Sequence, residues 1–101
     1  MMEFSKEKTK YEMRFTSAMK KDMKRIVKRH YDLNLFAEVV EKLANGQPLE
    51  EKYCDHALEG NWKDHCELHI RPDWLLIYQI KNDILILELS RTGTHADLFG
   101  K

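Results

Sequence analysis

The spacing of apolar residues changes along the chain, and each stretch predicts a different element. Residues 11–15 alternate between apolar and polar side chains, which predicts a short strand with one buried face. From residue 19 to residue 30 the apolar positions recur mostly three or four apart, which predicts an amphipathic helix that Thr16 or Ser17 caps. The stripe of this helix consists of Met19, Met23, Ile26, Val27 and His30.

A second apolar stripe follows at once and predicts a second helix. Its members are Leu35, Phe36, Val39, Val40 and Leu43. Asp32 is the expected N-cap, and Gly46 with Pro48 just beyond it is the expected stop. Because the break over residues 31–34 is short, the two helices are predicted to form an antiparallel hairpin.

After residue 48 the helical spacing gives way to extended segments. Residues 49–61 show no clear period and are predicted to be a loop. Residues 62–70 alternate, Arg71 and Pro72 interrupt them, and residues 74–80 and 84–89 are rich in branched and aromatic side chains around a turn at 81–83. These segments predict three consecutive antiparallel strands.

Together the elements predict a small α+β domain. A strand is followed by a helix hairpin that packs on one face of a mainly antiparallel sheet. The opposite face of that sheet is then available for a ligand. The last two strands are apolar on both faces, so they are expected to be central or to line a cleft.

Length and composition add few constraints to this fold. A chain of 101 residues with 43% hydrophobic residues suits a single domain over 1–101, with residues 1–9 as a loose leader. The apolar run at 74–78 is far shorter than a membrane-spanning helix, and the N-terminal segment lacks the apolar core of a signal peptide. Two cysteines are too few for a disulfide framework, so a cytoplasmic location is expected.

The charge is balanced overall but not locally. The 17 basic and 17 acidic residues give a formal net charge of zero. Within the predicted first helix, however, one acid, Asp22, stands among six cations: Lys20, Lys21, Lys24, Arg25, Lys28 and Arg29. Such a run is either a solvated helix face or a surface that attracts phosphate.

Histidine and cysteine in the second half offer two kinds of chemistry. Cys54 and His56, together with Cys66 and His69, would be a ligand set for tetrahedral zinc. The spacing of these residues argues against zinc, because positions 66 and 69 of one strand point to opposite faces. Cys66 is instead expected to be a buried apolar residue, and His65 an exposed strand residue.

Cleavage of RNA without a metal is the second possibility. RNA carries its own nucleophile, the 2′-hydroxyl, so a protein needs a base, an acid and a cation near the phosphate. The candidates for proton transfer are His56, His69, Asp73 and His95. Arg91 is a candidate for bidentate phosphate binding, and Trp74 or Phe99 for stacking on a base.

Four short segments of the second half match a known family in order and in spacing. They are Asp55-His56, then Leu58-x-Gly60-x-Trp62, then His69-x-x-Pro72-Asp73-Trp74-x-Leu76-Ile77-Tyr78, and finally Arg91-Thr92-Gly93-Thr94-His95-x-x-Leu98-Phe99. With them, most of residues 53–100 resembles the YafQ branch of the RelE/ParE superfamily of bacterial toxins. Residues 1–50 match this family in pattern more than in letters.

This resemblance implies a RelE-like ribonuclease-type fold and the toxin half of a type II toxin–antitoxin system. Toxins of this kind enter the ribosomal A site and cut mRNA there without a metal or other cofactor. An antitoxin partner wraps the toxin and neutralises it, commonly in a two-to-two assembly. The family's active-site positions correspond here to His56, His69, Asp73, Trp74, Arg91, His95 and Phe99.

The roles of these residues follow partly from chemistry. His56 or His69 is the expected base toward the 2′-hydroxyl, and His95, helped by Asp73, the expected acid toward the leaving 5′ oxygen. Asp73 could instead orient a histidine, and Arg91 would stabilise the transition state. The basic run from Lys20 to Arg29 would attract ribosomal RNA, or an acidic antitoxin could cover it.

Two alternatives keep the same fold. Toxins of the ParE type bind DNA gyrase, but they generally lack the histidine cluster. A catalytically inactive relative would bind only its antitoxin, but every motif position is filled here. The net charge of zero is low for a protein that docks on ribosomal RNA, which bears on the strength of docking and not on the site.

Overall fold

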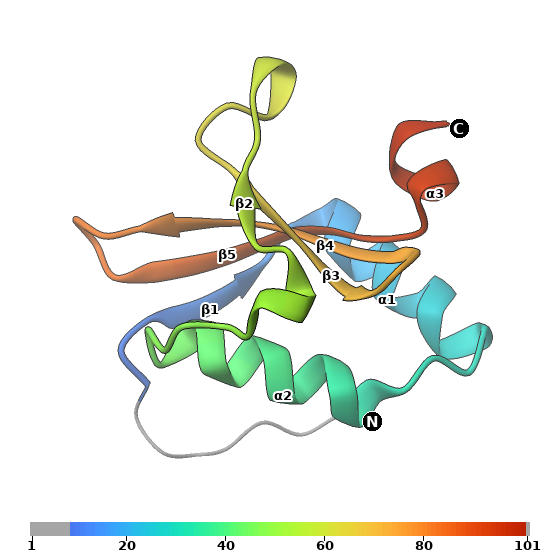
Figure 1. Ribbon diagram of the computed structural model, residues 1–101, viewed down its shortest axis with the longest axis horizontal. Helices are drawn as coiled ribbons and strands as arrows, with labels where there is room; N and C mark the ends of the chain where they lie inside the picture. The colour runs from blue at the N-terminus through green and yellow to red at the C-terminus, as the bar shows by residue number, and fades with distance from the viewer. Residues whose placement is uncertain (1–8, 101) are drawn as a thin grey trace.

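The computed structural model describes residues 9–100 and shows an α+β domain (Figure 1). The predicted leader lies almost wholly outside these residues. The described elements are β1 Glu12–Phe15, α1 Ser17–Lys28, α2 Leu33–Ala44, β2 His56–Ala57, β3 Cys66–Arg71, β4 Trp74–Lys81, β5 Ile86–Gly93 and α3 His95–Phe99, with 3-10 turns at Glu51–Tyr53 and Gly60–Trp62. None of the helices within residues 9–100 combines the length and the apolar character that spanning a bilayer requires.

The strands form one mixed sheet in the order β1-β5-β4-β3-β2. β1 runs parallel to β5, and the other neighbours are antiparallel. The predicted antiparallel run of β3, β4 and β5 is therefore confirmed. β1 joins it as a parallel edge strand, and the helix pair follows β1 in the chain and leads toward β2 at the opposite edge of the sheet.

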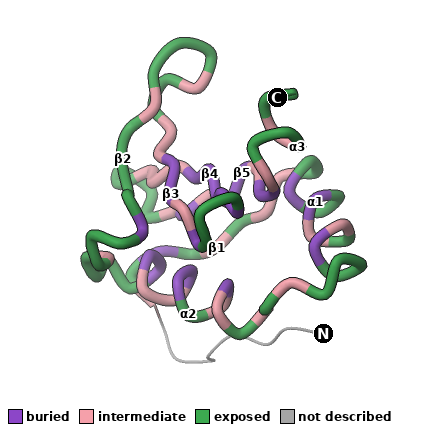
Figure 2. Tube along the Cα trace, turned by 45° about the vertical axis from the view of Figure 1, so that its right-hand side comes forward, coloured by how far each residue is buried: buried purple, intermediate pink, exposed green. Residues whose placement is uncertain are grey.

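Both helices cover the same face of the sheet, as predicted. The caps are those expected: Thr16 accepts a hydrogen bond from the Met19 N–H, and Asp32 accepts from the first turn of α2. Met19 and Phe36 lie in one buried cluster with apolar residues of β3, β4 and β5. Figure 2 shows the buried side of each helix turned toward the sheet and its other side exposed.

α1 also closes the edge of β5 where β1 ends. The Thr16 hydroxyl donates to the Ser90 carbonyl at 2.8 Å, and the Asp22 carboxylate accepts from the Thr92 N–H at 3.1 Å. These groups would otherwise leave an unpaired strand edge. Asp22 is therefore buried on the stripe, whereas Val27 and His30 are exposed. The predicted burial of His30 is wrong because α1 ends at Lys28 and His30 turns away with a φ of 60°. That of Val27 is wrong because Val27 lies on α1 outside the side formed by Met19, Asp22 and Ile26.

Predictions for four other segments need correction. Residues 62–65 are not strand, because a 3-10 turn ends at Trp62 and Asp64 takes a φ of 71°. β5 starts later and ends later than expected, since Leu85 has a φ of 53° and Gly93 still pairs with Leu75. The C-terminal segment forms α3, which the sequence did not indicate, and the predicted loop at 49–61 contains β2.

Candidate active site

Cross-strand pairing gathers polar side chains on the sheet face that points away from the helices. His56 pairs with Glu67, and Glu67 pairs with Ile77. Ile77 in turn pairs with Arg91. Residues paired across strands point to the same face, and the neighbouring Leu68 belongs to the helix-side cluster. The face left open by the helices therefore carries His56, Glu67 and Arg91.

Three histidine rings form a row over this face. The ring centroids of His56 and His69 are 6.4 Å apart, and those of His69 and His95 are 5.8 Å apart. The rings come from β2, β3 and the first residue of α3. The structure thus brings together three of the predicted proton-transfer residues, with His69 in the middle.

The local backbone fixes both the position and the proton of His56. Its Nδ1 lies 2.6 Å from the Cys54 carbonyl oxygen, which can only accept, so Nδ1 carries a proton and Nε2 is left as the reactive atom. Cys54 turns the chain with a φ of 50°. Tyr78 anchors the segment, because its hydroxyl donates to Asp55 at 2.5 Å. Burial and the Asp55 carboxylate together raise the pKa of Tyr78, so the hydroxyl remains a donor.

Glu67 is a member of the site that was missing from the predicted set. Its side chain is only 10% exposed, and its Oε1 lies 3.6 Å from His56 Nε2 and 3.5 Å from His69 Nε2. A buried carboxylate requires such partners. The signal was present in the sequence, because positions 67 and 69 have the same parity in the strand and so face the same side.

Asp73 orients His95. One oxygen, Oδ1, accepts from the His95 backbone N–H at 2.9 Å and lies 2.6 Å from His95 Nδ1. The backbone hydrogen bond from His95, followed by the ring hydrogen bond, lowers the pKa of Asp73, so this carboxylate is ionised at neutral pH. Nδ1 is then the donor, which leaves Nε2 of His95 as the ring nitrogen that Asp73 does not engage. The predicted orienting role of Asp73 has this geometry in its support.

Arg91 is held by Asp22. Its Nε and Nη2 donate to the two oxygens of Asp22 at 2.6 and 3.1 Å, and these hydrogen bonds raise the pKa of the guanidinium. The bidentate fork expected for a phosphate is therefore occupied by a carboxylate. Arg91 can still place positive charge beside the site, since its side chain is 25% exposed.

Trp74 is part of the core, so its predicted stacking on a base is corrected. The residue is 2% exposed, and its Nε1 donates to the Thr92 hydroxyl at 3.0 Å. Its ring stacks on Phe36 and meets Tyr31 edge to face. Side chains at alternate positions of β4 point toward the helices. Position 74 is one of these, so the Trp74 ring lies in the core and not over the candidate site.

A Trp74→Phe variant separates these two roles. We expect the free energy of unfolding to fall by about 1–3 kcal/mol, because the ring is smaller and the bond to Thr92 is lost. The cleavage rate should stay at the wild-type value. Urea unfolding followed by circular dichroism, beside a cleavage assay, measures both. If the variant is as stable as the wild type but cuts slowly, Trp74 acts in cleavage and its role in the core is contradicted.

Phe99 and four lysines are accessible, as their predicted roles require. Phe99 ends α3 and is 39% exposed. The exposed cations of α1 are Lys20, Lys21, Lys24 and Lys28. Arg25 is less free, since its Nη1 lies 3.3 Å from Asp22 and 3.9 Å from Asp97. The basic surface of α1 therefore rests on its lysines.

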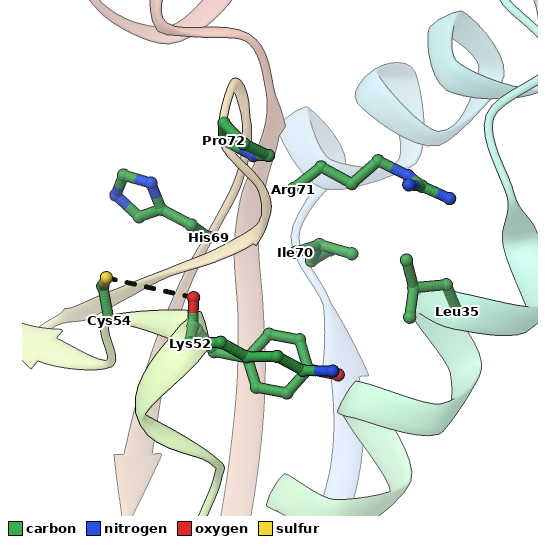
Figure 3. Close-up of a pocket in the computed structure, with 8 residues that line it drawn as sticks. Leu35, Lys52, Cys54, His69, Ile70, Arg71 and Pro72 are labelled. Atoms are coloured by element: carbon green, nitrogen blue, oxygen red, sulfur yellow. Dashed lines mark hydrogen bonds between the residues drawn. The ribbon is translucent and has the colours of Figure 1, made fainter.

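An open groove of about 570 Å³ adjoins the histidine row (Figure 3). His69 and Ile70 point to opposite sides of β3 in this view, so the groove passes along the edge of the strand. Ile70, Leu35 and Pro72 give it apolar walls, and Lys52 and Arg71 supply two cations. A ligand that combines polar groups with flat apolar rings fits such a lining.

The zinc alternative finds no support in the arrangement of the side chains. Cys66 packs against the helix-side core, whereas His69 lies on the other face, as the parity argument predicts. Burial raises the pKa of the Cys66 thiol. Among residues 9–100, no group of three or more His, Cys, Asp or Glu is placed to hold a metal ion. His65 precedes β3 and meets the Trp62 ring at 5.2 Å, outside the row.

Comparison with known proteins agrees with this fold. A family model described as "Bacterial toxin of type II toxin-antitoxin system, YafQ" matches residues 11–100. The mRNA interferase toxin YafQ of Escherichia coli strain K12 is 41% identical over 90 residues, covering 88% of this chain and 96% of that protein. Proteins so named are endoribonucleases, which agrees with the predicted enzyme class.

Solved structures give the same result. A chain of the E. coli DinJ–YafQ toxin–antitoxin complex has a TM-score of 0.82 at 39% identity and covers 90% of this chain and 99% of that one. A metal-bound toxin from Helicobacter pylori has a TM-score of 0.82 at 46% identity and covers 86% and 97%. The resemblance seen in the sequence is confirmed: the chain belongs to the YafQ family of bacterial toxins of type II toxin–antitoxin systems.

Proposed function

We propose that this toxin is a ribosome-dependent endoribonuclease that cuts mRNA in the ribosomal A site by general acid–base chemistry. The observation that carries the proposal is the row of His56, His69 and His95 on an open sheet face. Each end of this row has its own carboxylate, Glu67 or Asp73. Such a row can remove one proton and deliver another across a single phosphate.

Cleavage begins at the end of the row near Glu67. Nε2 of His56 or of His69 accepts the proton of the 2′-hydroxyl while the 2′ oxygen attacks phosphorus. Glu67 Oε1, at 3.6 and 3.5 Å from the two Nε2 atoms, then balances the positive charge on whichever ring was protonated. Arg91 adds positive potential at the phosphate as negative charge develops.

Cleavage ends at His95. His95 starts this step as the imidazolium, with one proton on Nδ1 toward Asp73 and a second on Nε2. The Nε2 proton passes to the 5′ oxygen as the bond between phosphorus and that oxygen breaks, which leaves the ring neutral. The products are a 2′,3′-cyclic phosphate and a free 5′-hydroxyl, so no water and no external reactant is consumed. Asp73 keeps Nδ1 as the donor atom, which leaves Nε2 to face the leaving group.

Ribosome and mRNA are held by separate surfaces in this proposal. The lysines of α1 meet ribosomal RNA through phosphate contacts, which tolerate a net charge of zero because the charge is local. Phe99 stacks on a base beside the cut, and the groove along β3 takes the adjoining nucleotide. In the bacterial cytoplasm an antitoxin would bind and neutralise the toxin, as DinJ accompanies YafQ in the E. coli complex.

Purified protein, mRNA and ribosomes test the proposal directly. We expect cutting within codons when the mRNA is on programmed ribosomes and little cutting of naked mRNA. EDTA at a concentration that leaves ribosomes intact should not change the rate, because every proton-transfer group belongs to the protein. Equal cutting of naked RNA would contradict ribosome dependence. Growth arrest with intact mRNA would favour a gyrase-type target instead.

A further inference from the structure

Asp97 joins α3 to the rest of the molecule. Its Oδ2 accepts from the Thr94 N–H at 2.9 Å, while the Asp97 N–H donates to the Thr94 hydroxyl at 3.1 Å. The same carboxylate accepts from Arg29 Nη1 at 2.6 Å and from Nη2 at 3.1 Å. One side chain therefore closes the capping box of α3 and binds the C-terminal end of α1.

α3 needs such a tether. It has five residues, and a helix of this length is not stable without tertiary contacts. Its first residue is His95 and its last is Phe99, and both belong to the proposed site. The placement of these two side chains depends on where α3 lies, because neither is buried.

The close approach of Asp97 to β5 also fixes this arrangement. A Cβ built at Gly93 would lie 2.9 Å from Asp97 Oδ2, and Gly93 has a φ of 151°. The Asp97 side chain is only 14% exposed. The Arg29 guanidinium holds the pKa of Asp97 well below its usual range, so the carboxylate remains ionised at any working pH.

We propose that Asp97 is a positioning residue that, through Arg29 and the capping box of α3, fixes His95 and Phe99 over the scissile phosphate. The proposal rests on the proposed function. It also gives Arg29 a different role from the other cations of the basic run. Arg29 holds Asp97 within the protein instead of attracting ribosomal RNA. Bidentate contact with a carboxylate gives this pair the directionality that isolated surface ion pairs lack.

The negative charge of Asp97 allows a positioning role to be distinguished from a role in docking on the ribosome. Replacing Asp97 by alanine removes a negative charge beside the basic run of α1, which should strengthen attraction to ribosomal RNA. A fall in the cleavage rate of this variant cannot then come from weaker docking. Positioning predicts that kcat falls while KM for programmed ribosomes stays equal or decreases.

The test compares Asp97→Ala and Arg29→Met with two matched controls. Asp83→Ala removes an exposed carboxylate from the turn between β4 and β5, and Arg14→Met removes an exposed cation from β1. Single-turnover cutting at saturating programmed ribosomes should be about 10–100-fold slower in the first pair, from misplacement of the catalytic group. The controls should cut at the wild-type rate.

Hydrogen exchange gives a readout besides activity. The amides of α3 should exchange faster in Asp97→Ala and Arg29→Met, while those of β4 and β5 keep their protection. Asp97→Asn retains an acceptor for Thr94 without the charge, so it should fall between wild type and Asp97→Ala. It also keeps the test decisive if the alanine variant does not fold.

Two outcomes would overturn the proposal. One is a kcat at the wild-type value in both Asp97 variants and in Arg29→Met. The other is a loss of rate in Asp97→Ala that arises wholly from a raised KM. If the wild-type toxin itself fails to cut ribosome-bound mRNA, the proposed function fails, and the hydrogen-exchange comparison still decides whether Asp97 fixes α3.

Discussion

A His95→Ala variant is expected to cut ribosome-bound mRNA about 10²–10⁴-fold more slowly than the wild type, the usual loss when a general acid is removed. The reason is chemical. The 5′ alkoxide is a poor leaving group unless it is protonated as it departs, and no other histidine in the described residues is paired with Asp73. Ribosome binding should be unchanged, because the basic face of α1 is untouched.

The matched control for this variant is His65→Ala. His65 stands before β3 against the Trp62 ring and takes no part in the histidine row. It should cut at the wild-type rate. Single-turnover cleavage and a ribosome-binding assay are measured together for both variants. Cutting by His95→Ala at the wild-type rate would remove His95 from the mechanism.

Asp73 stays ionised throughout the neutral range, so it adds no pH dependence of its own to this step. Hydrogen bonds from His95 lower its folded-state pKa, so its contribution to holding α3 is present above the ordinary aspartate pKa and is lost as pH falls through the lowered value. A change of rate near neutral pH therefore reports on the histidines. Asp73→Asn should keep the fold and slow cleavage, since an amide cannot accept as strongly from Nδ1.

The sequence predicted most of the framework because apolar periodicity is a local signal. The stripe around Phe36 and the branched residues of β4 allow few arrangements other than a helix pair on a sheet. The C-terminal segment was different. α3 is five residues long, and its stability comes from Asp97 and Arg29, which are 68 positions apart. Such contacts leave no period in the sequence.

The site was predicted in part for the same reason. The family motifs placed His56, His69 and His95 in the candidate site, because residue types at fixed spacing are visible in one dimension. The motif spacing did not show whether a given side chain lies on the surface or in the core. Trp74 faces the helices and Arg91 faces Asp22, since a buried aspartate on α1 caps the free edge of β5. Glu67 was overlooked because a single carboxylate on a strand is common.

Replacing both His56 and His69 by alanine is expected to reduce cleavage about 10²–10⁴-fold, as for loss of a general base. Each single variant should lose much less than the double. Both Nε2 atoms approach the same Glu67 oxygen, at 3.6 and 3.5 Å, so either ring can take the 2′-hydroxyl proton in the same electrostatic setting. Single-turnover rates of the four proteins form a double-mutant cycle.

That cycle tests a shared base rather than two separate roles. If the rings substitute for one another, the combined loss in the double variant exceeds the product of the two single losses. If one ring is the base and the other only binds the phosphate, the losses multiply. Glu67→Gln should slow both single variants alike, because it removes the charge that either protonated ring would face, whereas Glu88→Gln on β5 should slow neither. Multiplied losses, or a glutamine variant that affects only one background, would contradict the shared base and leave one histidine as the sole acceptor of the proton.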